Sequence, residues 1–585
     1  MTDFLKTTLA SVIGLMLALG ILVTIFSSYL ANEPIPEIPE RCVLVLDETL
    51  ITSEAGTSPS LVGWMTEQEF STVPLRSVIE GIRAASTDNR IQAILLLNEG
   101  QYHGMTARRE MQNALMEFRD TGKTIYAYAP DYSQNGYYLA SVADPVVMPP
   151  LGIFDMKGLS AEVEYYATAM ESVGLEMQVT RVGKYKSAVE PYLLSESSEA
   201  NREQMMSLLT GIQSTFLSDV SGARGLSEAS LQNIVETGGL LSAAQALEAG
   251  LVDQVAYYDE MLEALQELVG DGDDYEAFAQ VGIYRYISEL EESEDAQSGP
   301  TIGVIYAEGE IVDGFTEDGI GGDTLAAKLR SARFDSGISG VVLRVNSPGG
   351  SASASEVILR EMQLLKEAGK SVVVSMGPVA ASGGYWISCQ ADTIFAEPNT
   401  ITGSIGVFGM FPNMEGLLDE VGVKVEVFKT GPHADLFSIY HHKSDEQMAV
   451  MQTYVDNIYD GFLDRVAEGR NMDRSAVHEI AQGRVWTGAR ALELGLVDGL
   501  GDLDVAIAHC AMLMEADVWQ LEFLEEEAEG AELFLEEIMA PIDYPVVDLG
   551  LPEEAKFLWK GLQTFTGYAQ RPGVYARLPF NVNIR

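Results

Sequence analysis

The chain has 585 residues, and its 87 acidic residues against 36 basic ones give a formal net charge of −51. A hydrophobic content of 47% excludes a disordered chain, and the length is enough for several domains. The acidity also excludes nucleic acid as an expected partner, because a phosphate backbone would be repelled rather than neutralised.

The N-terminus carries a long uncharged segment. No charged residue lies between Lys6 and Glu33. Residues 7–32 exceed the roughly 20 apolar residues that cross a bilayer as a helix. The alternative is a cleavable signal peptide, whose apolar region spans only about 7–15 residues. We therefore expect a short tail (1–6) and a transmembrane anchor (7–32) in a lipid bilayer, with the remainder of the chain outside the cytoplasm.

The rest of the chain contains an internal repeat. ALEAGLVD at 246–253 differs at one position from ALELGLVD at 491–498. NGYYLASVAD at 135–144 aligns with GGYWISCQAD at 383–392. Their offset of 248 residues is close to the offset between the first two segments. Similar segments in the same order and at nearly one offset indicate a duplication.

The duplication divides the chain into two α/β halves with an acidic linker between them. The expected divisions after the anchor are an N-terminal half (33–287), the linker (288–300), a C-terminal half (301–516) and an acidic C-terminal extension (517–585).

Strand-like runs alternate with an amphipathic helix in the C-terminal half. The runs lie at 301–312, 340–345 and 371–376. Ile358, Met362 and Leu365 share one helical face between the last two runs. This order predicts βαβ units with a parallel sheet. Sites in such sheets lie at the carboxyl ends of the strands, so we expect the chemistry in SPGG (347–350) and in a loop at 377–384.

The sequence has few signals for metal or nucleotide chemistry. Six histidines are present, without an HExxH pattern, and neither a DxDxDG loop nor a Walker A motif occurs. We therefore expect no metal site and no cofactor.

A serine between small residues is the best candidate nucleophile. Ser382 follows two alanines and precedes Gly383 and Gly384 at the expected start of a helix. The N–H of Gly383 could stabilise an oxyanion, with a second donor from Gly350 or Gly349 in the SPGG turn. The alternative is that Ser382 simply caps the helix.

The duplication suggests a base for this serine. At the offset of 248, Ser382 aligns with Gln134, and Lys186 aligns with Ala434. Each half thus lacks one member of a Ser–Lys pair, which predicts a composite site within one chain or between subunits. The lysine pKa of about 10.4 would have to fall by about 3 units, which burial can achieve. Lys184 is a competing candidate.

Several longer stretches resemble a known family. IGGDTLAAKLR, VLRVNSPGGSASASEV, VSMGPVAASGGYWIS, NTITGSIGVFG and the KYKSAVEPY segment (184–192) are similar to long-form signal peptide peptidase A. The resemblance implies tandem duplicated crotonase/ClpP-like domains and a bacterial membrane-anchored serine protease. It also implies Ser382 as the nucleophile, Lys186 as the general base and Ser404 as the hydroxyl that orients the lysine. Gly383, Gly350 and Gly349 match the oxyanion hole.

The same resemblance implies the biological setting. The substrates would be signal peptides that remain in the membrane after secretory proteins are released. The enzyme would be a homotetramer in the bacterial inner membrane, with its catalytic part on the periplasmic or outer side.

Three other functions stay open at this stage. A crotonase-type acyl-CoA enzyme would use the same oxyanion glycines without a Ser–Lys pair. A ClpP-like Ser–His–Asp protease would need a histidine base, for which His433 is the nearest candidate. A non-catalytic membrane scaffold would cleave nothing.

Overall fold

The computed structural model describes residues 38–47, 52–55, 73–97, 104–272, 277–293, 299–316, 319–524 and 573–578. The expected tail and anchor, residues 1–6 and 7–32, lie outside these ranges. Among the helices within them, none is both long and apolar enough to cross a membrane.

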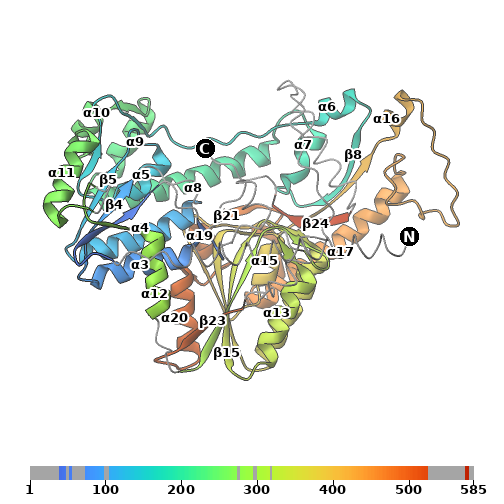
Figure 1. The fold of residues 1–585 in the computed structure, drawn as a ribbon. Coiled ribbons are helices and arrows are strands. Elements are labelled where there is room, and N and C mark those ends of the chain that lie inside the picture. The colour runs from blue at the N-terminus through green and yellow to red at the C-terminus, as the bar shows by residue number, and fades with distance from the viewer. Residues whose placement is uncertain are drawn as a thin grey trace, which may run out of the picture.

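The N-terminal half is built on a parallel sheet with the strand order β10-β6-β5-β4-β1-β11 (Figure 1). Strand β1 is wholly apolar and β4 is apolar apart from Gln92, as expected for strands covered on both faces. The strands are β1 (Cys42–Leu46), β4 (Ile91–Leu97), β5 (Thr124–Tyr128), β6 (Val146–Met148), β10 (Gln254–Val255) and β11 (Gln280–Gly282).

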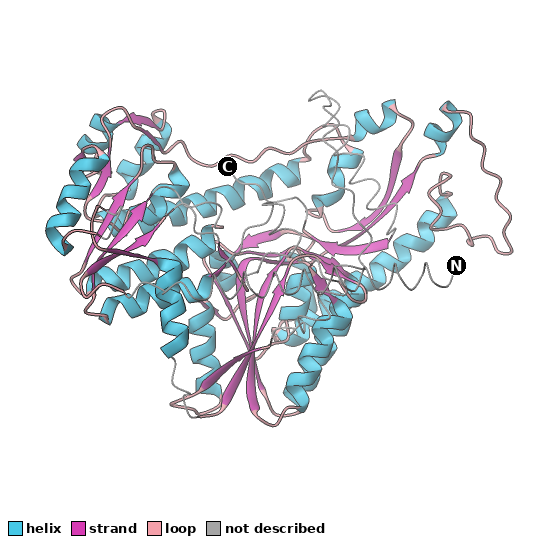
Figure 2. Ribbon diagram, in the orientation of Figure 1, coloured by secondary structure: helices cyan, strands magenta, loops and turns pink. Residues whose placement is uncertain are grey.

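Helices pack around this sheet (Figure 2). They are α3 (Leu75–Thr87), α4 (Met105–Asp120), α5 (Gln134–Ala140), α8 (Glu199–Arg224), α9 (Glu228–Glu236), α10 (Ala243–Glu248), α11 (Tyr258–Val269) and α12 (Ile283–Ser293). Two further helices, α6 (Ala167–Ser172) and α7 (Glu190–Leu193), lie away from this sheet and beside the strand β8 (Glu176–Val182) (Figure 1). Two small pairs complete this half: β2 (Thr52–Ser53) with β3 (Val73–Pro74), and β7 (Ile153–Asp155) with β9 (Leu240–Ser242). Helix α12 extends into the range 288–300 that we expected to be linker.

The C-terminal half has a larger sheet, ordered β21-β19-β17-β15-β12-β23, with β18 beside β17 and β22 beside β18. Its strands are β12 (Thr301–Glu308), β15 (Ile338–Ser347), β17 (Ser371–Ala381), β18 (Thr393–Ala396), β19 (Ile401–Gly403), β21 (Val485–Thr487), β22 (Gly499–Leu500) and β23 (Gln520–Phe523). The parallel pairing of β12, β15 and β17 confirms the expected arrangement of the three runs.

The expected loop at 377–384 is wrong for most of its length. Strand β17 continues to Ala381, because β19 takes the place of β18 on one side, where Val379 pairs with Ile401, while β15 still pairs on the other through Ser347 and Ala380. The sharp turn comes only at Ser382.

Helices also cover the C-terminal sheet: α13 (Gly322–Phe334), α14 (Ala352–Glu367), α15 (Gly383–Ser388), α17 (Asp445–Gly469), α18 (Arg474–Ile480), α19 (Gly488–Glu493) and α20 (Leu503–Leu513). Helix α16 (Glu415–Glu420) lies away from this sheet, where the Leu417 N–H donates to the Gly174 carbonyl at 2.8 Å. Ile358, Met362 and Leu365 of α14 are all buried, which confirms the amphipathic helix predicted from their spacing.

The same tertiary hydrogen bond occurs in both halves. Tyr137 in α5 donates its hydroxyl proton to the Leu251 carbonyl at 2.7 Å. Tyr385 in α15 donates in the same way to the Leu496 carbonyl at 2.8 Å. Both tyrosines and both acceptors belong to the repeated segments, so the repeat in sequence is also a repeat in structure.

A third sheet joins the two halves. Its order is β14-β13-β16-β24-β20-β8. The strands are β8 (Glu176–Val182), β13 (Ile311–Val312), β14 (Ile320–Gly321), β16 (Gly349–Ser351), β20 (Val407–Asn413) and β24 (Gly573–Arg577). β8 comes from the N-terminal half and pairs with β20 along seven residues. The range expected as an acidic extension (517–585) supplies β23 and β24 to two sheets.

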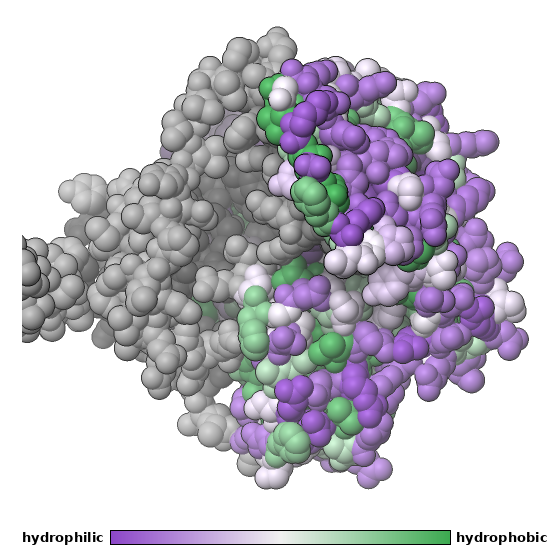
Figure 3. Space-filling view, turned by 90° about the vertical axis from the view of Figure 1, so that its right-hand side faces the viewer, coloured by the Kyte–Doolittle hydropathy of each residue, from purple (hydrophilic) through white to green (hydrophobic). Residues whose placement is uncertain are grey.

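The side of the molecule that carries α16 and α17 is covered mostly by hydrophilic residues in its described part (Figure 3). This agrees with the large excess of acidic residues. Charged side chains stay in water at little cost, so such a surface favours solubility.

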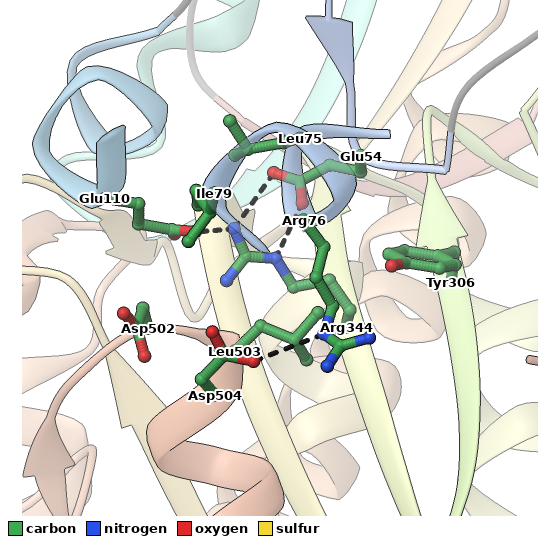
Figure 4. A pocket seen from close by; sticks show the side chains of 10 residues that line it. All are labelled: Glu54, Leu75, Arg76, Ile79, Glu110, Tyr306, Arg344, Asp502, Leu503 and Asp504. Atoms are coloured by element: carbon green, nitrogen blue, oxygen red, sulfur yellow. Dashed lines mark hydrogen bonds and ion pairs between the residues drawn. The ribbon is translucent and has the colours of Figure 1, made fainter. Parts of the chain in front are cut away.

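A buried cluster of charges also joins the halves (Figure 4). Arg344 of β15 forms ion pairs with Glu54 at 2.8 Å and with Glu110 at 2.7 Å. It donates a further hydrogen bond to Ser375 at 2.9 Å. Burial raises the pKa of Glu110 to about 8, and Glu54 contributes in the same direction while Arg344 opposes both. One guanidinium is therefore bound to two acidic side chains from the other half.

We predict that Arg344→Met destabilises the protein by about 3–5 kcal/mol, because it leaves two buried acidic side chains, Glu54 and Glu110, without their cationic partner. The loss should be smaller below pH 8 than above it, because Glu110, whose pKa is raised to about 8, is then protonated and needs no counter-charge. Urea unfolding at two pH values measures both effects. Arg330→Met is the matched control, since Arg330 is half-exposed and pairs with Glu361 at 2.8 Å. Equal losses in the two variants would contradict this account.

Candidate active site

Ser382 and Ser404 are brought together by the pairing of two strands. Ala381 at the end of β17 pairs with Gly403 at the end of β19, and the two serines follow these residues directly. The Ser382 N–H donates to the Gly403 carbonyl at 2.8 Å. Both serines are fully buried and have positive backbone φ angles, of 58° and 51°. Such conformations cost about 1–3 kcal/mol in non-glycine residues and tend to occur at functional sites.

Lys186 reaches the same place from the N-terminal half. The end of β8 lies beside the start of β20, where Val182 pairs with Val407. The chain then turns at Gly183, whose φ is 109° and where a Cβ would come within 2.5 Å of the Gln482 backbone. This turn directs Lys186 inward, just before a short 3-10 helix at 187–189.

The lysine amine contacts both serines. Nζ of Lys186 lies within hydrogen-bond distance of Oγ of Ser382, at 2.8 Å, and of Oγ and the carbonyl oxygen of Ser404, at 3.0 and 3.1 Å. All three residues belong to one chain, so the contact does not require a second subunit. The competing candidate Lys184 is exposed and contacts the hydroxyl of Tyr185 at 3.3 Å.

The environment of Lys186 favours its neutral form. The side chain is fully buried, and this burial lowers the pKa of Lys186 well below its usual 10.5. The ring of Phe408 lies 5.9 Å from Nζ. A neutral amine has a free lone pair, which can accept the hydroxyl proton of Ser382.

The glycines of the SPGG turn lie against Gly383. A Cβ on Gly349 would come within 2.5 Å of the Gly383 nitrogen, and a Cβ on Gly350 would clash with the Ile311 carbonyl. The Gly349 N–H donates to Oγ of Ser347 at 3.2 Å. Only glycine therefore fits this part of the turn, and the structure brings the three glycines together.

Ser382 precedes α15 but does not cap it through its side chain. By contrast, Ser133 of the N-terminal half accepts a hydrogen bond from the Gly136 N–H at 3.1 Å and caps α5. Gln134, which aligns with Ser382, donates a hydrogen bond from its side-chain Nε2 to Oε1 of Gln213 at 2.9 Å. The repeated turn thus has a structural role in the N-terminal half, whereas in the C-terminal half it presents the Ser382 hydroxyl to the Lys186 amine.

His433 lies in another environment. Its Nε2 is 4.0 Å from Oε1 of Glu446. Among the described residues, no histidine forms a hydrogen bond with Ser382. This geometry does not favour the Ser–His–Asp alternative.

The residues that hold the lysine turn in place were not foreseen. Gln204 of α8 donates to the Tyr185 carbonyl at 3.0 Å and to Oγ of Ser187 at 2.9 Å. Ser187 in turn donates to Asn201 at 2.8 Å. Asn201 and Gln204 are polar residues on the buried face of the long helix α8. Their spacing in the sequence indicates that they are buried, but it does not indicate which residues they contact.

The family model of Peptidase family S49 matches residues 117–271 and 364–517, so it matches the chain twice. Protease 4 of Salmonella typhi is 37% identical over 515 residues, which cover 85% of this chain and 82% of that protein. An Enterococcus faecium protein, named as a candidate signal peptide peptidase SppA, is 41% identical over 34% of this chain and 58% of its own length. The solved structure of a mutant ClpP1 from Listeria monocytogenes superposes with a TM-score of 0.24 at 14% identity, covering 35% of this chain and 94% of its own.

We predict that the stability contributed by position 186 depends on pH. Because the pKa of Lys186 is lowered by folding, the unfolded chain binds a proton that the folded chain excludes, so stability rises with pH across the window between the two pKa values. Relative to Lys186→Met, the wild type should gain at most about 1.4 kcal/mol per pH unit in this window.

Urea unfolding between about pH 7 and pH 10 measures this difference. Lys184→Met is the control, because Lys184 is exposed. If the stability curves of the wild type and Lys186→Met ran parallel over this range, the buried neutral amine would be excluded.

Proposed function

The chain belongs to Peptidase family S49 and is a serine protease, and from this premise we propose that Ser382 and Lys186 are its catalytic dyad. The observation that carries the proposal is the 2.8 Å contact between Lys186 Nζ and Ser382 Oγ in a fully buried setting. A nucleophile and its base must lie within hydrogen-bond reach, about 2.6–3.2 Å.

The reaction proceeds through an acyl-enzyme. Neutral Lys186 takes the hydroxyl proton of Ser382 as Oγ attacks the peptide carbonyl, and then gives that proton to the leaving amine. A water molecule attacks the resulting ester, and the lysine again serves first as base and then as acid. The lowered pKa of Lys186 supports this role, because a charged amine cannot accept a proton.

Gly383 and Gly350 supply the oxyanion donors in this proposal. Their positions at the start of α15 and in the SPGG turn support the assignment. Gly349 is the weaker candidate, because its N–H is already directed at Oγ of Ser347. Its role is to let the backbone of the turn approach Gly383 closely.

Ser404 positions the lysine. Its hydroxyl and carbonyl oxygens lie 3.0 and 3.1 Å from Nζ, so they can accept hydrogen bonds from the ammonium form that arises while Ser382 reacts. A hydrogen bond to the charged form stabilises it and raises the pKa of the lysine, which moderates the strong effect of burial.

The substrates in this proposal are signal peptides left in a membrane. The name of the Enterococcus faecium relative and the apolar segment 7–32 support this substrate class. The segment would anchor a homotetramer of crotonase/ClpP-like chains in the inner membrane of a bacterium, with the catalytic halves on the periplasmic or outer side. Anchoring would place the site close to peptides that partition into the bilayer.

We predict that Ser382→Ala and Lys186→Ala each lower the cleavage rate of a synthetic signal peptide in detergent micelles by about 10⁴-fold, because each removes one member of the dyad. Mass spectrometry of the fragments measures the rate. His433→Gln and Lys184→Met are controls that should stay close to the wild type. Near-normal turnover in either alanine variant would overturn the dyad, and failure to cleave signal peptides while a soluble peptide is cleaved would overturn the substrate class.

We also predict that Ser404→Ala lowers kcat/KM by about 10–100-fold. Loss of the hydroxyl should lower the pKa of Lys186 further and shift the acidic limb of the pH profile to lower pH. Ser404→Gly separates this effect from backbone strain, because glycine adopts the positive φ at no cost. A limb that stays in place or moves to higher pH in both variants would contradict the positioning role.

A further inference from the structure

The strand next to the oxyanion glycines comes from the end of the chain. β24 lies between β16 and β20 in the third sheet and runs antiparallel to both (Figure 1). Three residues of β24 pair with each neighbour. A slot between two strands is the position in which an extended peptide can bind through its backbone on both sides.

The register of β24 places one carbonyl at the proposed oxyanion site. The Leu578 N–H donates to the Pro348 carbonyl at 2.7 Å. Since bonded and non-bonded pairs alternate in an antiparallel ladder, Gly350 and Ala576 form the next bonded pair, so the Gly350 N–H faces the Ala576 carbonyl. A Cβ on Gly349 would clash with that carbonyl oxygen, and one on Gly383 would lie 3.1 Å from it.

The side chains of this segment are held on both faces of the strand. Ala576 is fully buried. Leu578 is buried in an apolar pocket formed by Leu208, Ile212, Ala381, Ile401 and Val485. On the other face, the ring of Tyr575 lies 5.8 Å from that of Phe408, and Arg577 pairs with Glu310 at 3.2 Å.

We propose that β24 is a bound internal ligand, in which the tail of the chain occupies the peptide groove in the manner of a substrate and competes with external peptides. This inference rests on the proposed function of Ser382. The observed contacts of β24 also define which peptides the groove accepts. Such a peptide is an extended strand with a small residue at the oxyanion glycines and an apolar residue two positions further on.

Tethering makes this competition strong. A segment on the same chain acts at an effective concentration that can reach the millimolar range. The apparent dissociation constant of an external peptide is then raised by the inverse of the fraction of molecules whose groove is open. Substitutions that expel β24 should therefore tighten the binding of a peptide supplied in solution.

The test uses a fluorescent peptide with the sequence of residues 570–578 (QRPGVYARL) and full-length protein carrying Ser382→Ala, which prevents turnover. Adding Ala576→Arg forces a large charged side chain into a closed site and expels β24. Fluorescence anisotropy should then show at least about tenfold tighter binding of the peptide. Ala576→Ser, which keeps a small residue, should bind like the parent.

Leu578→Asp is a second expelling variant, in case the arginine disturbs folding, and it should tighten binding in the same way. Unchanged thermal unfolding of the remaining domain structure confirms that each variant is folded. Equal peptide affinity in the parent and in both expelling variants would overturn the proposal.

The binding measurement needs no catalysis, so its outcome is separate from that of the dyad. With Ser382 intact, expelling β24 should lower KM for an external peptide and leave kcat unchanged. Turnover with equal KM in all variants would mean that the protease assignment stands while the inference about β24 fails.

Discussion

The burial of one lysine amine against one serine hydroxyl is the constraint on which the rest of the structure depends. In the proposed dyad, Lys186 must be uncharged to act as a base, and its burial lowers its pKa well below the usual value. Neither half can provide this alone. β8 carries the lysine out of its own half into a sheet of the other, where Ser382 and Ser404 follow paired strands.

A contact of this kind needs two halves that cannot move apart. The third sheet provides part of the connection through its β8–β20 pairing, and Arg344 provides another part by binding Glu54 and Glu110. Buried ion pairs contribute little net stability compared with apolar packing, but they are costly to separate. The cluster therefore acts mainly to fix how the halves fit together. The retained tyrosine hydrogen bonds show that both halves kept their frameworks while their turns diverged.

Local sequence patterns predicted much of this structure. The apolar runs gave β12, β15 and β17, and comparison of the repeats singled out Ser382 and Lys186, because each has lost its counterpart in the other half. The exchange of β8 between halves and the insertion of β24 were not predictable, since strand pairing between distant segments leaves no periodic signal. The extension of β17 to Ala381 was missed for a similar reason, because glycine and proline at its centre resemble a loop. The hydrogen bonds by which Asn201 and Gln204 hold the Lys186 turn could not be predicted, because they depend on tertiary contacts alone.

The central claim is that Lys186 is neutral when the protein works. Direct titration of this side chain by NMR, with ¹³C-labelled lysine and assignment through the signal lost in Lys186→Arg, tests it without any substrate. The account predicts a Cε resonance that reports an uncharged amine at neutral pH and takes up a proton only on acidification. A resonance that reports a charged ammonium at neutral pH, and that titrates near the usual lysine pKa of about 10.4, would contradict it.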